Sequence, residues 1–173
     1  MALFHVSEQP DIVRLEPRPP ASQSGLGEDV VWAVDDEHLQ NYLLPRECPR
    51  VTFYALPTSD AVDVERLMRH TSARFVVAIE SGWLPIVRAT RLYVYELPPE
   101  AFVPLDVGAG YHVSRATVAP LDVVEVDDPL AALVARDVEL RVTPSLWRLR
   151  DAVVASTLQY SCIRMRNARP RGV

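Results

Sequence analysis

The sequence contains no lysine, and all 18 of its basic residues are arginines. A chain without lysine cannot form the Schiff base of pyridoxal-phosphate enzymes or of lysine aldolases. It also cannot supply the lysine of a P-loop or the lysine on the third strand of a protein kinase. These four classes of enzyme are therefore excluded before any motif is considered.

Cysteine is scarce as well, because Cys48 and Cys162 are the only two in 173 residues. This count excludes a disulfide scaffold. The four histidines share no ligand spacing with each other or with the cysteines, so we expect no metal site. A GxGxxG motif is absent, which removes support for a Rossmann site. Arg46 and Arg50 flank Cys48 and could lower the pKa of its thiol, although a half-buried loop cysteine is the simpler interpretation.

Long hydrophobic runs are missing too, since Phe75–Ile79 has the length of a strand rather than of a membrane span. The segment Met1–His5 has no basic region and no long apolar region. We therefore expect a cytoplasmic protein with no membrane partner. With 49% apolar and 24% charged residues, the chain is too apolar for intrinsic disorder and fits one globular domain over residues 1–173.

Charge is unevenly distributed along the chain. The formal net charge is −5, yet the residues from Arg141 onward include seven arginines and one acid, Asp151. Such a basic end could meet phosphates or nucleic acid. The simpler interpretation is that these arginines pair with the chain's own acids, because a pI of about 5.4 is low for a dedicated nucleic-acid binder.

Hydrophobic periodicity predicts many strands and few helices, which is typical of an α+β protein. Pro17–Gly27, rich in proline, serine and glycine, is expected to be a loop. The expected strands are Ala2–Val6, Val30–Val34, Val51–Ala55, Arg74–Glu80, Leu92–Leu97, Tyr111–Ser114, Val118–Val126 and Val138–Val142. The expected helices are Asp36–Leu44, Ser59–His70, Pro129–Arg136 and Pro144–Leu158.

Two groups of residues could bind a ligand. Alternation along the first strand places His5 and Ser7 on one face, where they could present donors to a ligand. A core histidine bound to a backbone carbonyl is the alternative. Trp32 ends the next strand and Tyr42 follows ten residues later, and flat heterocycles bind well between aromatic faces. Simple core packing of Trp32 is the alternative to this second group.

These two groups, in this order, resemble the ADP-ribosyltransferase fold. Enzymes of that fold begin with a strand whose His holds the ribose of NAD. A second strand then carries an aromatic residue that stacks on nicotinamide, and a helix follows. Phe4–Ser7 resembles the first element, and Val31–Asp35 followed by Tyr42 resembles the second. The resemblance implies a split antiparallel β-sheet with short peripheral helices.

The segments that follow resemble the rifampin ADP-ribosyltransferases in particular. Those proteins have a strand with a Glu, a Pro-rich turn into an acidic segment, a Tyr-x-Ser/Thr-Arg strand and a valine-rich strand. The corresponding segments here are Leu92–Leu97, Pro98–Asp106, Tyr111–Arg115 and Pro120–Val126. The resemblance covers residues 3–126 and leaves residues 127–173 as a helical, basic C-terminal extension. The Phe-His-Val-Ser start also resembles an uncharacterised family of small bacterial proteins.

The resemblance implies an NAD-binding transferase that passes ADP-ribose to an acceptor, or only hydrolyses NAD. It implies that His5 and Ser7 bind the ribose and that Trp32 and Tyr42 contact the nicotinamide. It also implies that Asp106 is the catalytic acid. Cleavage of the nicotinamide–ribose bond passes through an oxocarbenium-like state, which a carboxylate stabilises. The two phosphates of NAD would meet the guanidinium groups of Arg18 and Arg46, with Arg50 as a further candidate.

The sequence also departs from the family pattern. Val6 stands where the family has a glycine, and Arg91 stands where the polymerases have their catalytic Glu. Glu96 and Glu125 are therefore alternatives to Asp106. These departures keep two other functions open: a ligand- or partner-binding module without catalysis, and a relative that acts on the 2′-phosphate of RNA. The C-terminal arginines would serve either of these as an interaction surface.

Overall fold

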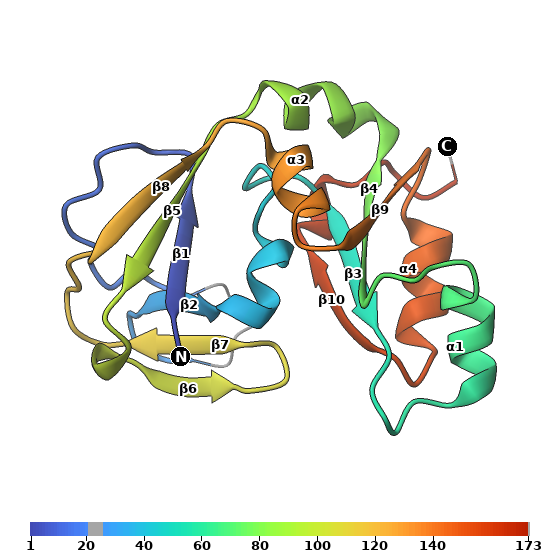
Figure 1. Cartoon of the computed structure of the whole chain (residues 1–173), viewed down its shortest axis with the longest axis horizontal. Coiled ribbons are helices and arrows are strands. Elements are labelled where there is room, and N and C mark those ends of the chain that lie inside the picture. Colours follow the sequence, from blue (N-terminus) through green and yellow to red (C-terminus); the bar gives the residue numbers. More distant parts are fainter. Residues whose placement is uncertain (21–25, 173) are drawn as a thin grey trace. The chain divides into compact units, whose positions relative to one another are not determined.

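The computed structural model describes residues 1–20 and 26–172. The chain divides into two compact units (Figure 1). Unit 1 comprises Met1–Tyr42 and Arg91–Asp127, and unit 2 comprises Leu43–Thr90 and Asp128–Val173. Residues 43–90 thus group with the C-terminal segment and not with the rest of residues 3–126. Each unit contains one β-sheet with short helices, so the expected α+β class is confirmed.

Unit 1 contains a six-stranded antiparallel sheet in the order β6-β7-β2-β1-β5-β8. The strands are β1 (Leu3–Ser7), β2 (Val31–Asp35), β5 (Leu92–Leu97), β6 (Val103–Asp106), β7 (Tyr111–Ser114) and β8 (Asp122–Val126), with short 3₁₀ helices η1 (Asp36–Asn41) and η3 (Pro99–Ala101). In Figure 1 the strands β1, β5 and β8 run across the direction of β2, β7 and β6. The change of direction falls between β1 and β2, which share only two residue pairs, whereas β1 and β5 share five.

The two faces of this sheet differ. Directly opposite residues of antiparallel strands share a face. The core face carries Leu3, which is opposite Asp35 on one side and Leu97 on the other. Its apolar cluster consists of Leu3, Leu15, Val31, Ala33, Tyr95, Leu97, Phe102 and Val118. The other face, called here the outer face, carries Phe4 opposite Val34.

Unit 2 contains a four-stranded sheet in the order β10-β3-β4-β9, in which β9 runs parallel to β4. The strands are β3 (Arg50–Tyr54), β4 (Phe75–Glu80), β9 (Val138–Thr143) and β10 (Gln159–Ile163). The helices are α1 (Ala61–Met68), α2 (Leu84–Ala89), α3 (Pro129–Val134) and α4 (Trp147–Val154), with 3₁₀ turns η2 (Ser81–Trp83) and η4 (Met165–Asn167). Side chains of α1 and α4 pack with Val51, Phe53 and Val76 in its main apolar cluster.

Capping carboxylates mark the starts of two helices. The carboxylate of Asp60 accepts the N–H of Val62 at the start of α1. Asp128 accepts the N–H groups of Leu130 and Ala131 at the start of α3, with Pro129 as the first helical residue. The predicted Asp36–Leu44 helix is the shorter 3₁₀ helix η1.

The expected helix Pro144–Leu158 is too long at both ends, because α4 spans Trp147–Val154. The hydroxyl of Ser156 accounts for the end, since it donates to the carbonyl of Val153 and accepts the N–H of Leu158. The chain then forms β10, which the sequence did not predict. The expected strand Val118–Val126 is shorter too, because β8 begins at Asp122. Pro120 lacks the N–H that a strand needs there.

Candidate functional site

Three half-buried aromatic side chains of unit 1 meet on the outer face of the sheet. The rings of Trp32 and Tyr111 form an edge-to-face pair with centroids 5.8 Å apart. Tyr42 and Tyr111 form a second such pair at 6.3 Å. The hydroxyl of Tyr42 also donates to the hydroxyl of Tyr111 at 2.8 Å. We call Trp32, Tyr42 and Tyr111 the aromatic trio.

Strand register explains why the trio forms. Val34 is directly opposite Tyr111, so the Trp32 ring, two residues away on β2, is a diagonal neighbour of Tyr111 on the same face. Tyr42 is not on a strand: it caps the C-terminus of the short helix η1, which follows β2. The sequence singled out Trp32 and Tyr42 but missed Tyr111, whose role depends on the pairing of β2 with β7.

Asp106 lies beside the trio. An irregularity in the β6–β7 pairing skips Leu105, so that Asp106 is opposite Tyr111. The carboxylate of Asp106 accepts the backbone N–H of Ala109 at 3.1 Å and so organises the turn between the two strands. The side chain is exposed. The structure therefore brings Trp32, Tyr42 and Asp106 together through Tyr111.

A histidine–carboxylate pair at the start of η1, formed by buried His38 and half-buried Asp35, supports this arrangement. Asp35 accepts hydrogen bonds from the backbone N–H of His38 at 2.9 Å and bonds the Nδ1 of the same residue at 2.7 Å. The N–H of Asp35 in turn donates to the carbonyl of Gly110 at 3.0 Å. Gly110 has φ +70°, and a Cβ there would lie 2.5 Å from the Asp35 carboxylate and against the ring of His38. Only glycine lets the residue before Tyr111 approach this pair so closely.

His5 is joined to the site through the backbone. Its Nδ1 lies 3.0 Å from the carbonyl oxygen of Trp32. A carbonyl can only accept, so Nδ1 carries the hydrogen. The contact is made where the β1–β2 pairing ends after Phe4. His5 is opposite Tyr95 on the core face, whereas Trp32 points to the outer face, so the two rings do not lie side by side.

The other residues predicted to bind NAD lie elsewhere. The hydroxyl of Ser7, on the core face, accepts the N–H of Gln9 at 3.0 Å. Arg18 exchanges two backbone hydrogen bonds with Val30, just before β2, and its exposed guanidinium forms no ion pair with the described residues. Of the expected loop Pro17–Gly27, residues 21–25 lie outside the described residues. Arg46 belongs to unit 2, where its carbonyl accepts from Arg164.

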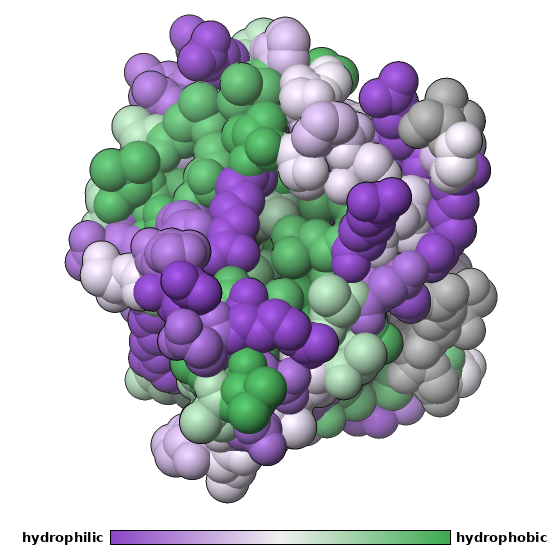
Figure 2. Space-filling view, turned by 90° about the vertical axis from the view of Figure 1, so that its right-hand side faces the viewer, coloured by the Kyte–Doolittle hydropathy of each residue, from purple (hydrophilic) through white to green (hydrophobic). Residues whose placement is uncertain are grey.

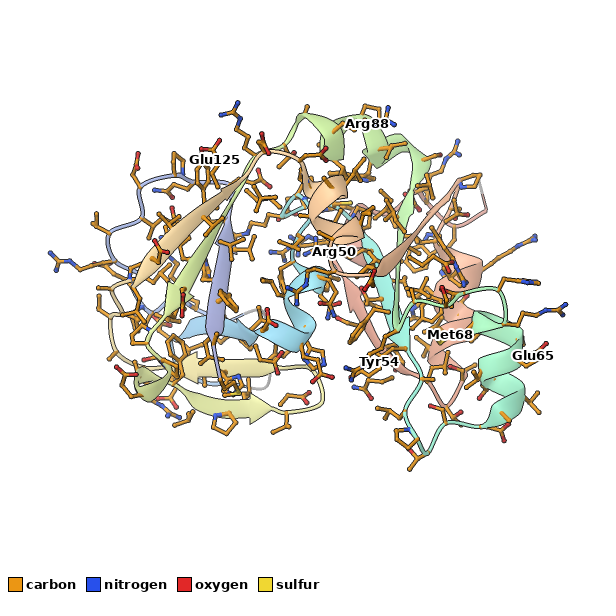
Figure 3. The ribbon with its side chains drawn as sticks, in the orientation of Figure 1. Arg50, Tyr54, Glu65, Met68, Arg88 and Glu125 are labelled. Carbon is orange, nitrogen blue, oxygen red and sulfur yellow. The ribbon has the colours of Figure 1, made fainter. Side chains whose placement is uncertain are left out.

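The alternative acids are placed differently from Asp106. Glu125, labelled in Figure 3, is opposite Tyr93 and shares the core face with Ser7. It forms an ion pair of 2.8 Å with Arg91. Glu96 is opposite Phe4 on the outer face, in a strand on the far side of β1 from the trio. Asp106 is thus the acid that the strand register places next to the aromatic trio.

The suggestion that arginines activate Cys48 is wrong. Burial raises the pKa of the Cys48 thiol to about 12, against a smaller lowering by Arg50. Arg50, labelled in Figure 3, is itself 2% exposed and donates to the carbonyls of Pro45 and Cys48 at 3.0 and 2.9 Å. Cys48 is therefore a core cysteine rather than a nucleophile.

The C-terminal arginines largely pair with acids of their own unit. Arg164 and Arg166 both contact Glu47, at 3.2 and 3.1 Å. Arg150 and Arg171 both contact Asp151. Figure 2 shows hydrophilic side chains interspersed with hydrophobic ones on the side that carries α1 and α4. The simpler interpretation of the basic end thus holds for these four arginines, and nucleic acid as a partner stays a prediction.

A pH dependence follows from Asp151. Hydrogen bonds from Arg171 and then Arg150 lower the pKa of Asp151 from 3.8 to about 2. Because the pKa of Asp151 is lower in the folded than in the unfolded state, its ionised carboxylate stabilises the folded state at pH values above 3.8. This stabilisation is lost as the pH falls from 3.8 towards 2. Asp151→Asn should therefore lower the urea midpoint slightly at pH 6, and the difference should close between pH 4 and pH 2.

The control for this prediction is Glu65→Gln on α1, because the ion pair of Glu65 with Arg69 is 3.5 Å long. It should change the midpoint less than Asp151→Asn at pH 6, because it removes a single long contact. If the urea midpoints of wild type and Asp151→Asn still differ by the same amount at pH 2, the ionised Asp151 is not the source of the stabilisation.

Among the residues that the structure describes, no group of three or more His, Cys, Asp or Glu side chains could hold a metal ion. Within the same residues, no helix is long and apolar enough to cross a membrane.

The two sheets and short helices define an α+β protein with an aromatic and acidic site on its bent antiparallel sheet. A family model matches residues 4–168, so the chain belongs to a family of unknown function, DUF6886. The expectation of an uncharacterised family is thereby confirmed. No curated protein and no solved structure matches the chain.

Proposed function

We propose that the protein binds NAD at the aromatic trio and cleaves its nicotinamide–ribose bond, passing ADP-ribose to an acceptor or to water. One observation supports this above the others: Asp106 is opposite Tyr111, against which Trp32 and Tyr42 both pack. The resemblance to the ADP-ribosyltransferase fold implies nicotinamide binding by Trp32 and Tyr42, and the resemblance to the rifampin enzymes implies that Asp106 is the catalytic acid. The resemblance implies no role for Tyr111.

The trio offers what a nicotinamide ring needs. Its half-buried rings supply apolar surface for a flat heterocycle. The hydroxyls of Tyr42 and Tyr111 are hydrogen-bonded to each other at 2.8 Å, and each hydroxyl can both donate and accept, so this pair offers a polar group to the carboxamide of nicotinamide. Trp32 then acts as the stacking residue, and the two tyrosines as the polar edge of the site.

Asp106 supplies the charge that the reaction needs. The sugar becomes positively charged as the nicotinamide leaves, and a fixed carboxylate stabilises that charge. One carboxylate oxygen is held by the N–H of Ala109, so the group is oriented before a ligand arrives. Fixing the group beforehand removes the reorganisation cost in the transition state.

His5 is a positioning residue in this proposal. Its ring holds the carbonyl of Trp32 at the point where β1 and β2 separate, and so sets the position of the Trp32 backbone. The resemblance gives His5 and Ser7 the ribose, but both lie on the core face, opposite to the trio, so neither of them contacts the ribose in this proposal. Arg18, whose exposed guanidinium forms no ion pair with the described residues, is the candidate for the phosphates in unit 1.

Thermal unfolding with and without NAD tests the binding step. A ligand at about a hundred times its dissociation constant adds roughly 2.7 kcal/mol to the stability of the folded state. For a chain of this size the midpoint should rise by roughly 5–10 °C. The double variant His5→Ala, Trp32→Ala should lose this rise.

The matched control is Trp83→Ala, which removes a half-buried indole from η2 in unit 2. It should keep the rise on adding NAD even if its own midpoint is lower. No rise in the wild type at millimolar NAD, or an equal rise in the double variant, would contradict binding at the trio.

A binding module without catalysis is the second candidate. It is favoured by Asp106, whose carboxylate already serves the turn that ends at Ala109. In that case NAD should raise the unfolding midpoint without any release of nicotinamide. A chain that binds an RNA end bearing a 2′-phosphate instead of NAD should respond only to that RNA in the same assay.

A further inference from the structure

Strand β8 is an open edge of the sheet in unit 1. It pairs with β5 on one side and ends the strand order on the other (Figure 1). The backbone N–H and C=O groups on the outer side of an edge strand can pair with another strand. On β8 one of these donors, the N–H of Val123, is bonded to the exposed carboxylate of Asp122 at 2.8 Å and must exchange that partner when another strand pairs. Leu121, Val123 and Val124 at this edge are 63%, 46% and 57% exposed, so apolar side chains flank those groups on both faces.

The opposite edge of the same sheet is closed. Strand β6 contains Pro104, which has no N–H to donate, and its pairing is irregular between Pro104 and Asp106. Both features are devices that keep edge strands from pairing with other chains. Strand β8 has neither, because it contains no proline and its register with β5 is continuous from Asp122 to Val126.

The sequence of β8 is complementary to itself. In an antiparallel pair of two copies centred on Val124, Asp122 is opposite Val126 and Val123 is opposite Glu125. Each acid then faces a valine, and Arg91 neutralises Glu125 within its own copy at 2.8 Å. A shift of one residue would set side chains of opposite faces against each other. A shift of two residues either sets the two Glu125 residues opposite each other, which destabilises a strand pair, or leaves only Asp122–Val124 paired.

We propose that two copies of this chain associate through β8, in antiparallel register centred on Val124, to form one continuous sheet. The occupant of the edge is a second copy, because the register that pairs all five residues of β8 is also one that keeps acids apart. A pair of five-residue strands buries less than the about 1,200 Å² typical of stable interfaces, so the association should be reversible and depend on concentration.

Sedimentation velocity over a concentration series tests whether the chain dimerises through β8. Wild type should shift from monomer towards dimer as concentration rises, and Val124→Lys should remain monomeric, since a charged edge residue opposes pairing. Val103→Lys, at a 51% exposed position on β6, is the matched control and should dimerise like wild type. A wild type that stays monomeric throughout, or a Val124→Lys variant that dimerises equally, would overturn the proposal.

Cysteine cross-linking tests the register. In the proposed pairing the two Val124 residues are directly opposite, with Cα atoms about 4.5–5.5 Å apart, within reach of a disulfide. The two Val123 residues are offset by two positions, roughly 8 Å apart, and too distant to bridge. Under oxidising conditions Val124→Cys should give a covalent dimer and Val123→Cys should not. The wild-type protein measures the background of cross-linking through Cys48 and Cys162. A covalent dimer of Val123→Cys but not of Val124→Cys would overturn the proposed register.

Discussion

Asp106→Asn is expected to leave NAD binding nearly unchanged and to slow nicotinamide release by roughly 100-fold or more, by analogy with the loss of one oxyanion-hole donor. The amide oxygen of Asn can still accept the N–H of Ala109 and keep the turn, but it carries no charge to stabilise the developing cation. Binding is measured by the shift in unfolding midpoint with NAD, and the rate by chromatography of released nicotinamide.

Asp122→Asn is the control for this substitution, because Asp122 is an exposed acid on the same sheet. It lies on β8, three strands from β2 in the strand order, and should not change the rate of release. If both variants release nicotinamide at the wild-type rate, Asp106 is not the catalytic acid. Equal loss of NAD binding and of rate in Asp106→Asn would show that the residue maintains structure instead.

Gly110→Ala should destabilise the protein by about 2–4 kcal/mol, combining the penalty of a positive φ with overpacking. The added methyl group would lie 2.5 Å from the Asp35 carboxylate oxygen and against the ring of His38, which are themselves tied to one another. The backbone around Tyr111 must then move, so the variant should also bind NAD more weakly. The free energy of unfolding in urea measures the first effect.

Gly27→Ala is the matched control in unit 1, because a Cβ at Gly27 would have nothing within 4 Å and its φ is not in the left-handed region. It should change the free energy of unfolding by less than about 0.5 kcal/mol, as most unconstrained surface substitutions do. A Gly110→Ala variant as stable as Gly27→Ala would contradict the close packing of β7 against the Asp35–His38 pair.

Local signals in the sequence predicted the regular elements well. The valine- and tyrosine-rich segments became β2, β4, β5 and β9, and the capping residues Asp60 and Asp128 marked the helix starts. Strands β6 and β10 were missed for physical reasons. Strand β6 contains Pro104, which argues against a strand, and β10 follows a helix whose end depends on Ser156.

The candidate site was predicted only in part. Trp32 and Tyr42 are close in sequence and were found from their spacing, but their convergence on Tyr111 depends on the register between β2 and β7. The place of Asp106 depends on a skipped residue in β6, which no periodicity reveals. Register between distant strands is set by tertiary packing, so the sequence named these residues but not their arrangement.

The most direct test of the account is the response of the three tryptophan indole N–H resonances to NAD, measured by proton–nitrogen NMR. Trp32 lies in the aromatic trio, whereas Trp83 and Trp147 belong to unit 2. The Trp147 indole, bonded to the carbonyl of Arg169, is an internal control. Trp32→Phe identifies the Trp32 resonance. We expect that resonance alone to move as NAD is added. Movement of none of the three, or of Trp83 or Trp147 without Trp32, would contradict an NAD site at the trio.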